Sequence, residues 1–89
     1  GGGEVIVADF TALSGGAVHN RHDPHACNDP DLKREWSRKV ENDFEAYRGN
    51  AELLESGAVV VCPEAEWRAE VQRLRAAHPG HFFAPVFPR

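Results

Sequence analysis

The side chains best suited to chemistry gather in one short segment, VHNRHDPHAC, which contains His19, His22, His25 and Cys27. Neutral imidazole and thiolate are the ligands that zinc and most divalent transition metals prefer. The spacing is H-x-x-H-x-x-H-x-C, which matches no zinc-finger, zinc-ribbon or metzincin pattern. The composition therefore raises the question of a metal site, whereas the spacing does not identify one.

Two interpretations of this segment follow. In the first, ligands from the segment bind a zinc ion and Cys62 adds a further one, although zinc sites usually take their ligands in two close pairs. In the second, residues 20–29 are a solvated loop whose turns are set by two Asp-Pro pairs. We favour the loop. The zinc-stabilised module is the alternative, and its candidate ligands are His19, His22, His25, Cys27 and Cys62.

Cys62 is a second candidate because it lies where an apolar run meets a predicted helix, in VVVCPEAEWR. A thiol at a helix N-terminus can act as a nucleophile. Cys62 and Arg68 have the C-x5-R spacing, which resembles the signature of cysteine-dependent phosphatases over about ten residues. Pro63 lacks the N–H that a phosphate loop needs, and Glu64 and Glu66 would repel the anion. We therefore reject this interpretation and expect Cys62 to be a small buried residue that ends a strand.

Other catalytic patterns are missing from the sequence. Neither Ser14 nor Ser37 has a nucleophile-elbow context, and there is no H-E-x-x-H array. Gly15-Gly16 alone indicates a turn rather than a phosphate-binding loop. A chain of 89 residues also leaves little room for a cleft. A small cysteine- or histidine-dependent enzyme is thus the third of three hypotheses, and we lean against it.

Length and composition limit the class of protein. Residues 4–89 make one domain, and we expect Gly1–Gly3 to be a remnant of cloning. The net charge of −4 argues against nucleic acid as the main partner. Two cysteines are few for a small secreted domain, and no apolar stretch predicts a membrane span or a signal peptide. We therefore expect a cytoplasmic protein that contacts neither nucleic acid nor membrane.

The first part of the chain predicts a hairpin. Glu4–Phe10 is a run of β-branched and apolar residues that indicates a buried strand. Ser14-Gly15-Gly16 then suggests a tight turn, because glycine adopts positive φ at little cost. The second strand of this N-terminal β-hairpin would end at His19.

Helices and a further strand follow. Asp29 and Pro30 predict a helix start, and apolar residues at 32, 36, 40, 44 and 47 form one stripe on a single helix that ends at Gly49. A short helix runs from Asn50 to Gly57, Ala58–Cys62 is a strand, and residues 63–78 form another helix.

This order of elements predicts a small α+β domain with its two main helices on one face of a mixed sheet. The long connection between strands 4–10 and 58–62 allows a parallel pair. Trp36 and Trp67 each belong to an apolar stripe. We therefore expect them to anchor one shared core between the two main helices.

The C-terminal tail, HFFAPVFPR, combines three phenylalanines with two prolines, so it is extended and at most an edge strand. It either binds a partner or folds back over the core. We predict a small accessory or regulatory module, of subunit or inhibitor type and without a cofactor, that binds another protein or a second copy through the sheet edge and the tail. The tail residues assigned to that contact are His81, Phe82, Phe83, Val86 and Phe87.

Overall fold

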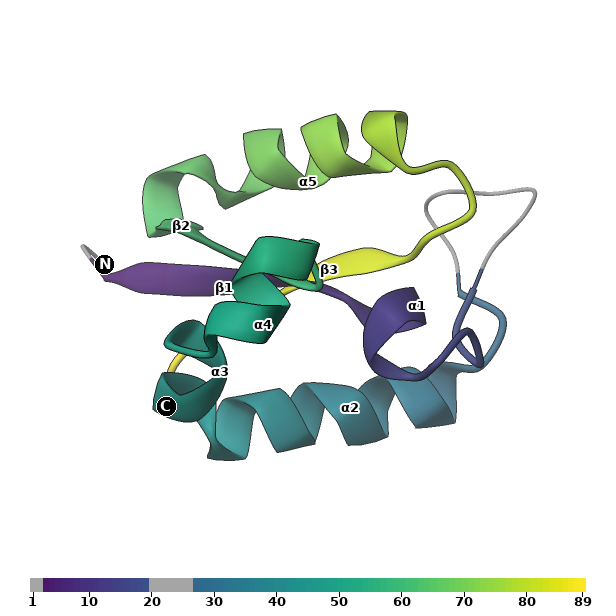
Figure 1. Cartoon of the computed structure of the whole chain (residues 1–89), viewed down its shortest axis with the longest axis horizontal. Helices are drawn as coiled ribbons and strands as arrows, with labels where there is room; N and C mark the ends of the chain where they lie inside the picture. The colour runs from purple at the N-terminus through teal and green to yellow at the C-terminus, as the bar shows by residue number, and fades with distance from the viewer. Residues whose placement is uncertain (1–2, 20–26) are drawn as a thin grey trace.

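The computed structural model describes residues 3–19 and 27–89, which form a three-stranded sheet flanked by helices (Figure 1). The α+β class is confirmed. The described elements, in chain order, are β1 (Glu4–Asp9), α1 (Phe10–Leu13), α2 (Pro30–Asn42), α3 (Phe44–Arg48), α4 (Ala51–Ser56), β2 (Val59–Pro63), the 3-10 helix η1 (Glu64–Glu66), α5 (Trp67–Ala77) and β3 (Phe83–Val86).

β1 is the middle strand, and β2 and β3 both pair with it antiparallel. Ile6 lies opposite Val61 on one side and opposite Val86 on the other. The predicted mixed sheet with a parallel pair is therefore wrong. The chain enters β2 at the end of the sheet where β1 leaves it, because the Asp9 N–H donates to the Ala58 carbonyl at 2.8 Å. The two strands must then run in opposite directions.

The predicted N-terminal hairpin is also wrong, because the helix α1 follows β1 directly. The Asp9 carboxylate accepts a hydrogen bond from the Ala12 N–H (3.1 Å) and so caps this short helix. The glycine pair follows α1 and leads the chain out of this helix, so it does not form a hairpin turn. Its φ angles, 66° at Gly15 and 92° at Gly16, are in the left-handed region that glycine adopts readily.

The single long helix predicted from the apolar stripe is two helices. Its start is confirmed, since the Asp29 side chain accepts from the Leu32 N–H at 3.0 Å. The break falls at Asp43, which has φ −117° and ψ 40°. Asn and Asp compete with the helix by forming local hydrogen bonds. The stripe itself still faces inward, because Val40 and Phe44 are both buried.

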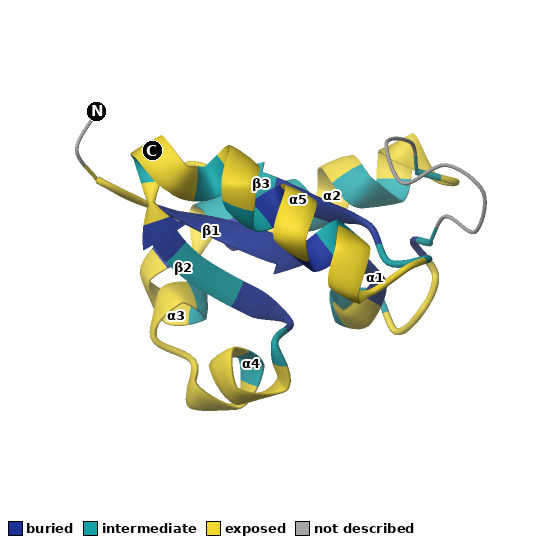
Figure 2. Ribbon diagram, turned by 90° about the horizontal axis from the view of Figure 1, so that it is seen from above, coloured by how far each residue is buried: buried dark blue, intermediate teal, exposed yellow. Residues whose placement is uncertain are grey.

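Side chains of β1 alternate between two cores on opposite faces of the sheet. Ile6 and Ala8 face the core that α2 and α3 complete, whereas Val5 and Val7 face the core that α5 completes. Figure 1 shows α5 on one face of the sheet and α2 on the other, and Figure 2 shows β1 buried between them. The expectation of helices on one face is therefore wrong.

The two tryptophans do not share a core. Trp36 packs against the α2–α3 side and Trp67 against the α5 side, and both are only half-buried. A strand that is apolar at every position is buried on both faces, and each face needs its own cover. One shared core would have left one face of β1 open.

The C-terminal tail is part of the fold. Its strand β3 pairs with β1, and Phe83 and Val86 keep only 1% and 4% of their surface exposed. Phe82 is buried in the other core. Of the two interpretations of the tail, the structure supports the one in which it folds back over its own core.

No helix in residues 3–19 and 27–89 is both long enough and apolar enough to cross a membrane.

Truncating Phe83 tests the role of the tail in stability. We expect Phe83→Ala to lower the free energy of unfolding by about 3–5 kcal/mol, because it leaves a cavity in the α5 core. Phe87→Ala is the matched control, since Phe87 is 40% exposed, and it should cost less than about 1 kcal/mol. Urea denaturation followed by circular dichroism measures both. Equal effects of the two variants would contradict the placement of β3.

Candidate functional site

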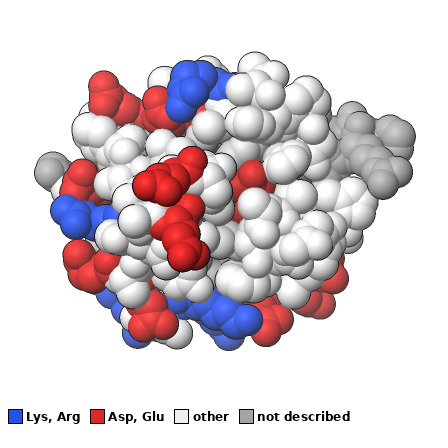
Figure 3. Space-filling model, in the orientation of Figure 1, with Lys and Arg blue, Asp and Glu red and all other residues white. Residues whose placement is uncertain are grey.

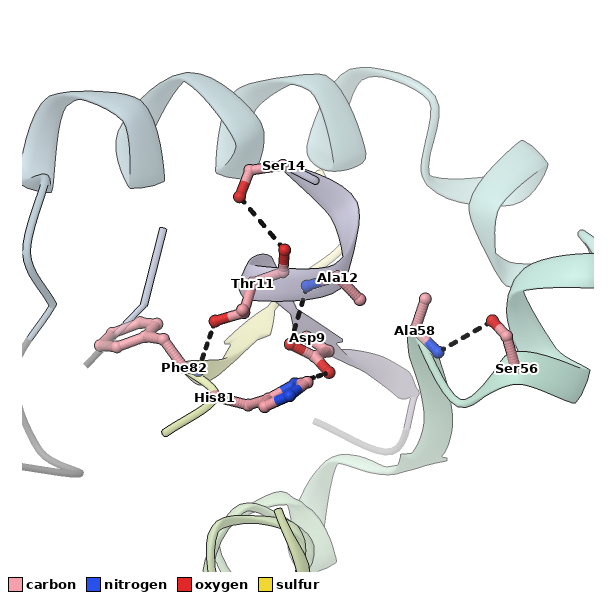
Figure 4. Close-up of polar contacts among 8 residues, drawn as sticks. All are labelled: Asp9, Thr11, Ala12, Ser14, Ser56, Ala58, His81 and Phe82. Carbon is pink, nitrogen blue, oxygen red and sulfur yellow. Dashed lines mark hydrogen bonds and ion pairs between the residues drawn. The ribbon is translucent and has the colours of Figure 1, made fainter. Parts of the chain in front are cut away.

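A buried carboxylate at the end of β1 organises the most polar part of the interior. Asp9 is only 6% exposed. One of its oxygens, Oδ1, caps α1, and the other, Oδ2, lies 2.8 Å from Nδ1 of His81 (Figure 4). These two residues are far apart in the sequence. The antiparallel sheet brings them together, because β3 begins beside the point where β1 ends.

This contact fixes the chemistry of the imidazole ring. A carboxylate oxygen accepts, so Nδ1 of His81 donates, and in the neutral ring Nε2 then carries the lone pair. The His81 side chain is 42% exposed. A carboxylate that holds one imidazole nitrogen while the other is accessible is the arrangement used by general bases. The Asp9–His81 pair can therefore orient a base, and it also ties the start of β3 to β1.

A hollow of about 340 Å³ lies next to this pair. Its walls include Thr11, His19 and His81, together with the backbone of Gly16 and Gly80. The Thr11 Oγ1 accepts from the Phe82 N–H at 2.9 Å (Figure 4). Nδ1 of His19 is buried and has no hydrogen-bond partner among the described residues. A buried polar atom without a partner costs free energy and calls for an explanation.

The structure separates the two cysteines among the candidate metal ligands. Cys27 packs against the α2–α3 core, and Cys62 lies in the α5 core on the opposite face of the sheet. Both are free thiols. His22 and His25 lie outside the described residues. Within 3–19 and 27–89, no group of three or more His, Cys, Asp or Glu side chains could hold a metal ion.

Cys62 is buried as predicted, with 6% of its surface exposed. Burial raises the pKa of its thiol, and the negative charges of Glu70, Glu66 and Glu4 raise it further. A reactive thiolate needs the opposite environment. The rejection of a phosphatase-like role for Cys62 therefore agrees with its surroundings.

An apolar groove runs between the helices on the other side of the sheet. Its volume is about 520 Å³, and it is lined by residues from α1, α2, α3 and α4 and by Ala58, just before β2. The largest lining side chains are Leu13, Trp36, Tyr47 and Leu53. Figure 3 shows uncharged surface beside α4 and over α1 on this face of the molecule. No sequence pattern predicts that these residues line one groove, because they come from four different helices.

The tail residues assigned to a partner contact differ in accessibility. Phe82, Phe83 and Val86 are buried in the two cores, whereas His81 and Phe87 keep exposed surface. Binding of a partner by the tail stays a prediction, and only these last two side chains have substantial surface to offer.

A scan against protein-family models and searches of curated proteins and of solved structures find no match for this chain.

Sequence reasoning missed Asp9 and Thr11. A usable signal was present, since an aspartate directly after an apolar strand run stands where a helix cap or a site residue is common. The partner His81 could not be paired with it, because the pairing depends on the position of β3. His19 is one of the candidate ligands of the alternative zinc site, and the structure places it in the wall of the hollow that His81 also lines.

The thiols provide a test of these surroundings. We expect Cys27 to react with a disulfide reagent at pH 8 and Cys62 to react only after denaturation, because Cys62 is buried and its pKa is raised above the ordinary value of 9.0. The folded state holds the Cys62 proton more tightly than the unfolded state. That stability is present below about pH 9 and is lost as the pH rises further.

The reaction is followed by absorbance, with Cys27→Ser as the control that isolates Cys62. Rapid modification of the folded Cys27→Ser variant would contradict this assignment.

Proposed function

We propose that this chain is a small accessory or regulatory module that binds a segment of another protein in the apolar groove between α1, α2, α3 and α4. The observation that carries the proposal is the groove itself, of about 520 Å³, lined by half-buried Trp36 and Tyr47. Tyr and Trp are enriched at the centres of protein interfaces, where they fill or form pockets. The volume suits one or two large apolar side chains of a partner.

Charge indicates the kind of partner. Asp43 lies in the wall of the groove, and Glu52 and Glu55 are exposed on α4. Figure 3 shows carboxylates over α4 in the middle of this face, with the Lys and Arg side chains nearer its rim. Complementary charges steer association and select the partner. We therefore propose a segment with an apolar anchor flanked by Lys or Arg.

Both edges of the sheet are poor sites for strand addition, which favours the groove. By the hydrogen-bond alternation, Pro63 on β2 and Pro85 on β3 stand where an N–H would point away from β1. On β3, the Phe83 carbonyl also accepts from Arg75 Nη2 at 3.4 Å. On β2, α4 packs against the strand and Val59 has no exposed surface.

The tail adds less to such a contact than its composition suggested. Phe87 packs edge-on against Trp67, with ring centroids 5.8 Å apart. This pair lies on the α5 side of the sheet, away from the groove. A partner that used it would have to reach around the molecule.

Two exposed helical alanines allow a matched test. Ala46 on α3 lines the groove, and Ala69 on α5 lies outside it. Peptides selected from a random phage library on the wild-type chain should carry apolar residues next to Lys or Arg. The best peptide, synthesised and titrated by fluorescence, should bind Ala46→Arg at least about tenfold more weakly, because the new side chain fills the groove and repels the basic flank. Ala69→Arg should bind within about twofold of wild type.

Equal affinity of all three proteins for the peptide would place the binding surface elsewhere. Failure to enrich any peptide would contradict the proposed class of partner.

A further inference from the structure

We propose that the Asp9–His81 pair and the hollow beside it form a second site, which hydrolyses small uncharged carboxylic esters. The site is separate from the groove, because the residues that line the two are different. Two observations carry the proposal. A buried carboxylate orients a partly exposed imidazole, and a hollow adjoins that imidazole.

His81 is the base. Its Nδ1 is held 2.8 Å from Asp9, so Nε2 is the ring atom with a free lone pair. Asp9 is itself fixed, because its other oxygen caps α1. A base whose tautomer and direction are set in advance loses no free energy to reorganisation during the reaction. Asp9 is therefore a positioning residue, and His81 is the group that meets the substrate water.

Thr11 supplies a hydrogen-bond donor in the same hollow. Its oxygen accepts from the Phe82 N–H at 2.9 Å, which fixes the side chain, and its own hydrogen has no acceptor among the described hydrogen bonds. A hydroxyl held in this way can donate to the oxyanion that forms on an ester carbonyl. His19 lies in the wall as well, although its Nδ1 is buried, so this atom does not contribute to the reaction.

The lining selects the class of substrate. The hollow measures about 340 Å³, at the lower end of the range for small-molecule sites. No Lys or Arg is among the described residues that line it, and the Asp9 carboxylate lies beneath His81. Among these described lining residues, a phosphate ester or another anion would meet no Lys or Arg side chain. An uncharged carboxylic ester needs only the base and the oxyanion donor.

The reaction consumes one ester and one water. The water oxygen forms a bond to the carbonyl carbon while its proton moves to Nε2 of His81, and the oxyanion accepts a hydrogen bond from Thr11. When this intermediate collapses, the bond from carbon to the alkoxy oxygen breaks. The leaving alkoxide takes the proton from Nε2. The products are a carboxylic acid and an alcohol, and His81 returns to its starting form.

The test uses the full chain and 4-nitrophenyl acetate, with nitrophenol release followed by absorbance between pH 6 and pH 9. We expect saturable hydrolysis at a rate at least about 100-fold above that of free imidazole at the same concentration. His81→Ala should reduce this rate about 100-fold or more, and added imidazole should restore part of it. His78→Gln is the matched control. His78 is an exposed histidine with its ring centroid 5.8 Å from that of His81, and it is not among the residues that line the hollow.

Asp9→Asn separates a positioning role from a structural one. Asn also caps helices, so the variant should keep its melting temperature within a few degrees. It should nevertheless lower kcat at least about tenfold with little change in KM, because an amide no longer selects the tautomer with Nε2 free. If Asp9→Asn proves too unstable to assay, His81→Ala and its rescue by imidazole carry the test.

Hydrolysis no faster than with free imidazole would overturn the proposal. So would His81→Ala with unchanged activity, an equal loss in His78→Gln, or the absence of rescue by imidazole. None of these results depends on the peptide-binding groove, so the two proposals stand or fall separately.

Discussion

The central strand β1 is the constraint on which the rest of the structure depends. It is hydrogen-bonded on both edges and buried on both faces, so that every residue from Val5 to Asp9 lies in the interior. A small chain cannot satisfy such a strand with one layer of helices. It needs α5 on one face, α2 and α3 on the other, and two further strands beside it. The chain past residue 58 supplies most of these partners.

The same constraint explains what could be predicted from the sequence. Elements set by local signals were predicted well, such as the start of α2 at Asp29-Pro30 and the inward stripe through Val40 and Phe44. The direction of β2 could not be predicted, because a long connection allows either parallel or antiparallel pairing. The hairpin failed for a more local reason. The glycine pair predicts a hairpin turn, whereas the Asp9 side chain caps a helix that begins directly after the strand.

Candidate sites followed a similar division. Composition pointed to histidines and cysteines as metal ligands, yet the two cysteines of that set, Cys27 and Cys62, lie on opposite faces of the sheet. Geometry brought together residues that no spacing rule connects, such as Asp9 with His81 and Leu13 with Leu53. The tail shows the opposite case. Its phenylalanines are conspicuous in the sequence and suggest a partner contact, but Phe82 and Phe83 are buried in the two cores and only Phe87 is exposed.

β3 follows β1 and all of the described helices along the chain, and this order has a consequence for biosynthesis. β1 is made first, but its partners on either side are made after most of the helices. During translation the segment VIVA is therefore an apolar strand with both edges open, which is the kind of sequence that associates between chains. The sheet is completed only after β3 (Phe83–Val86) has been made, and its pairing with the distant β1 forms slowly. A ribosome that stalls before Val86 would hold a chain in which the edge of β1 that pairs with β3 is still open.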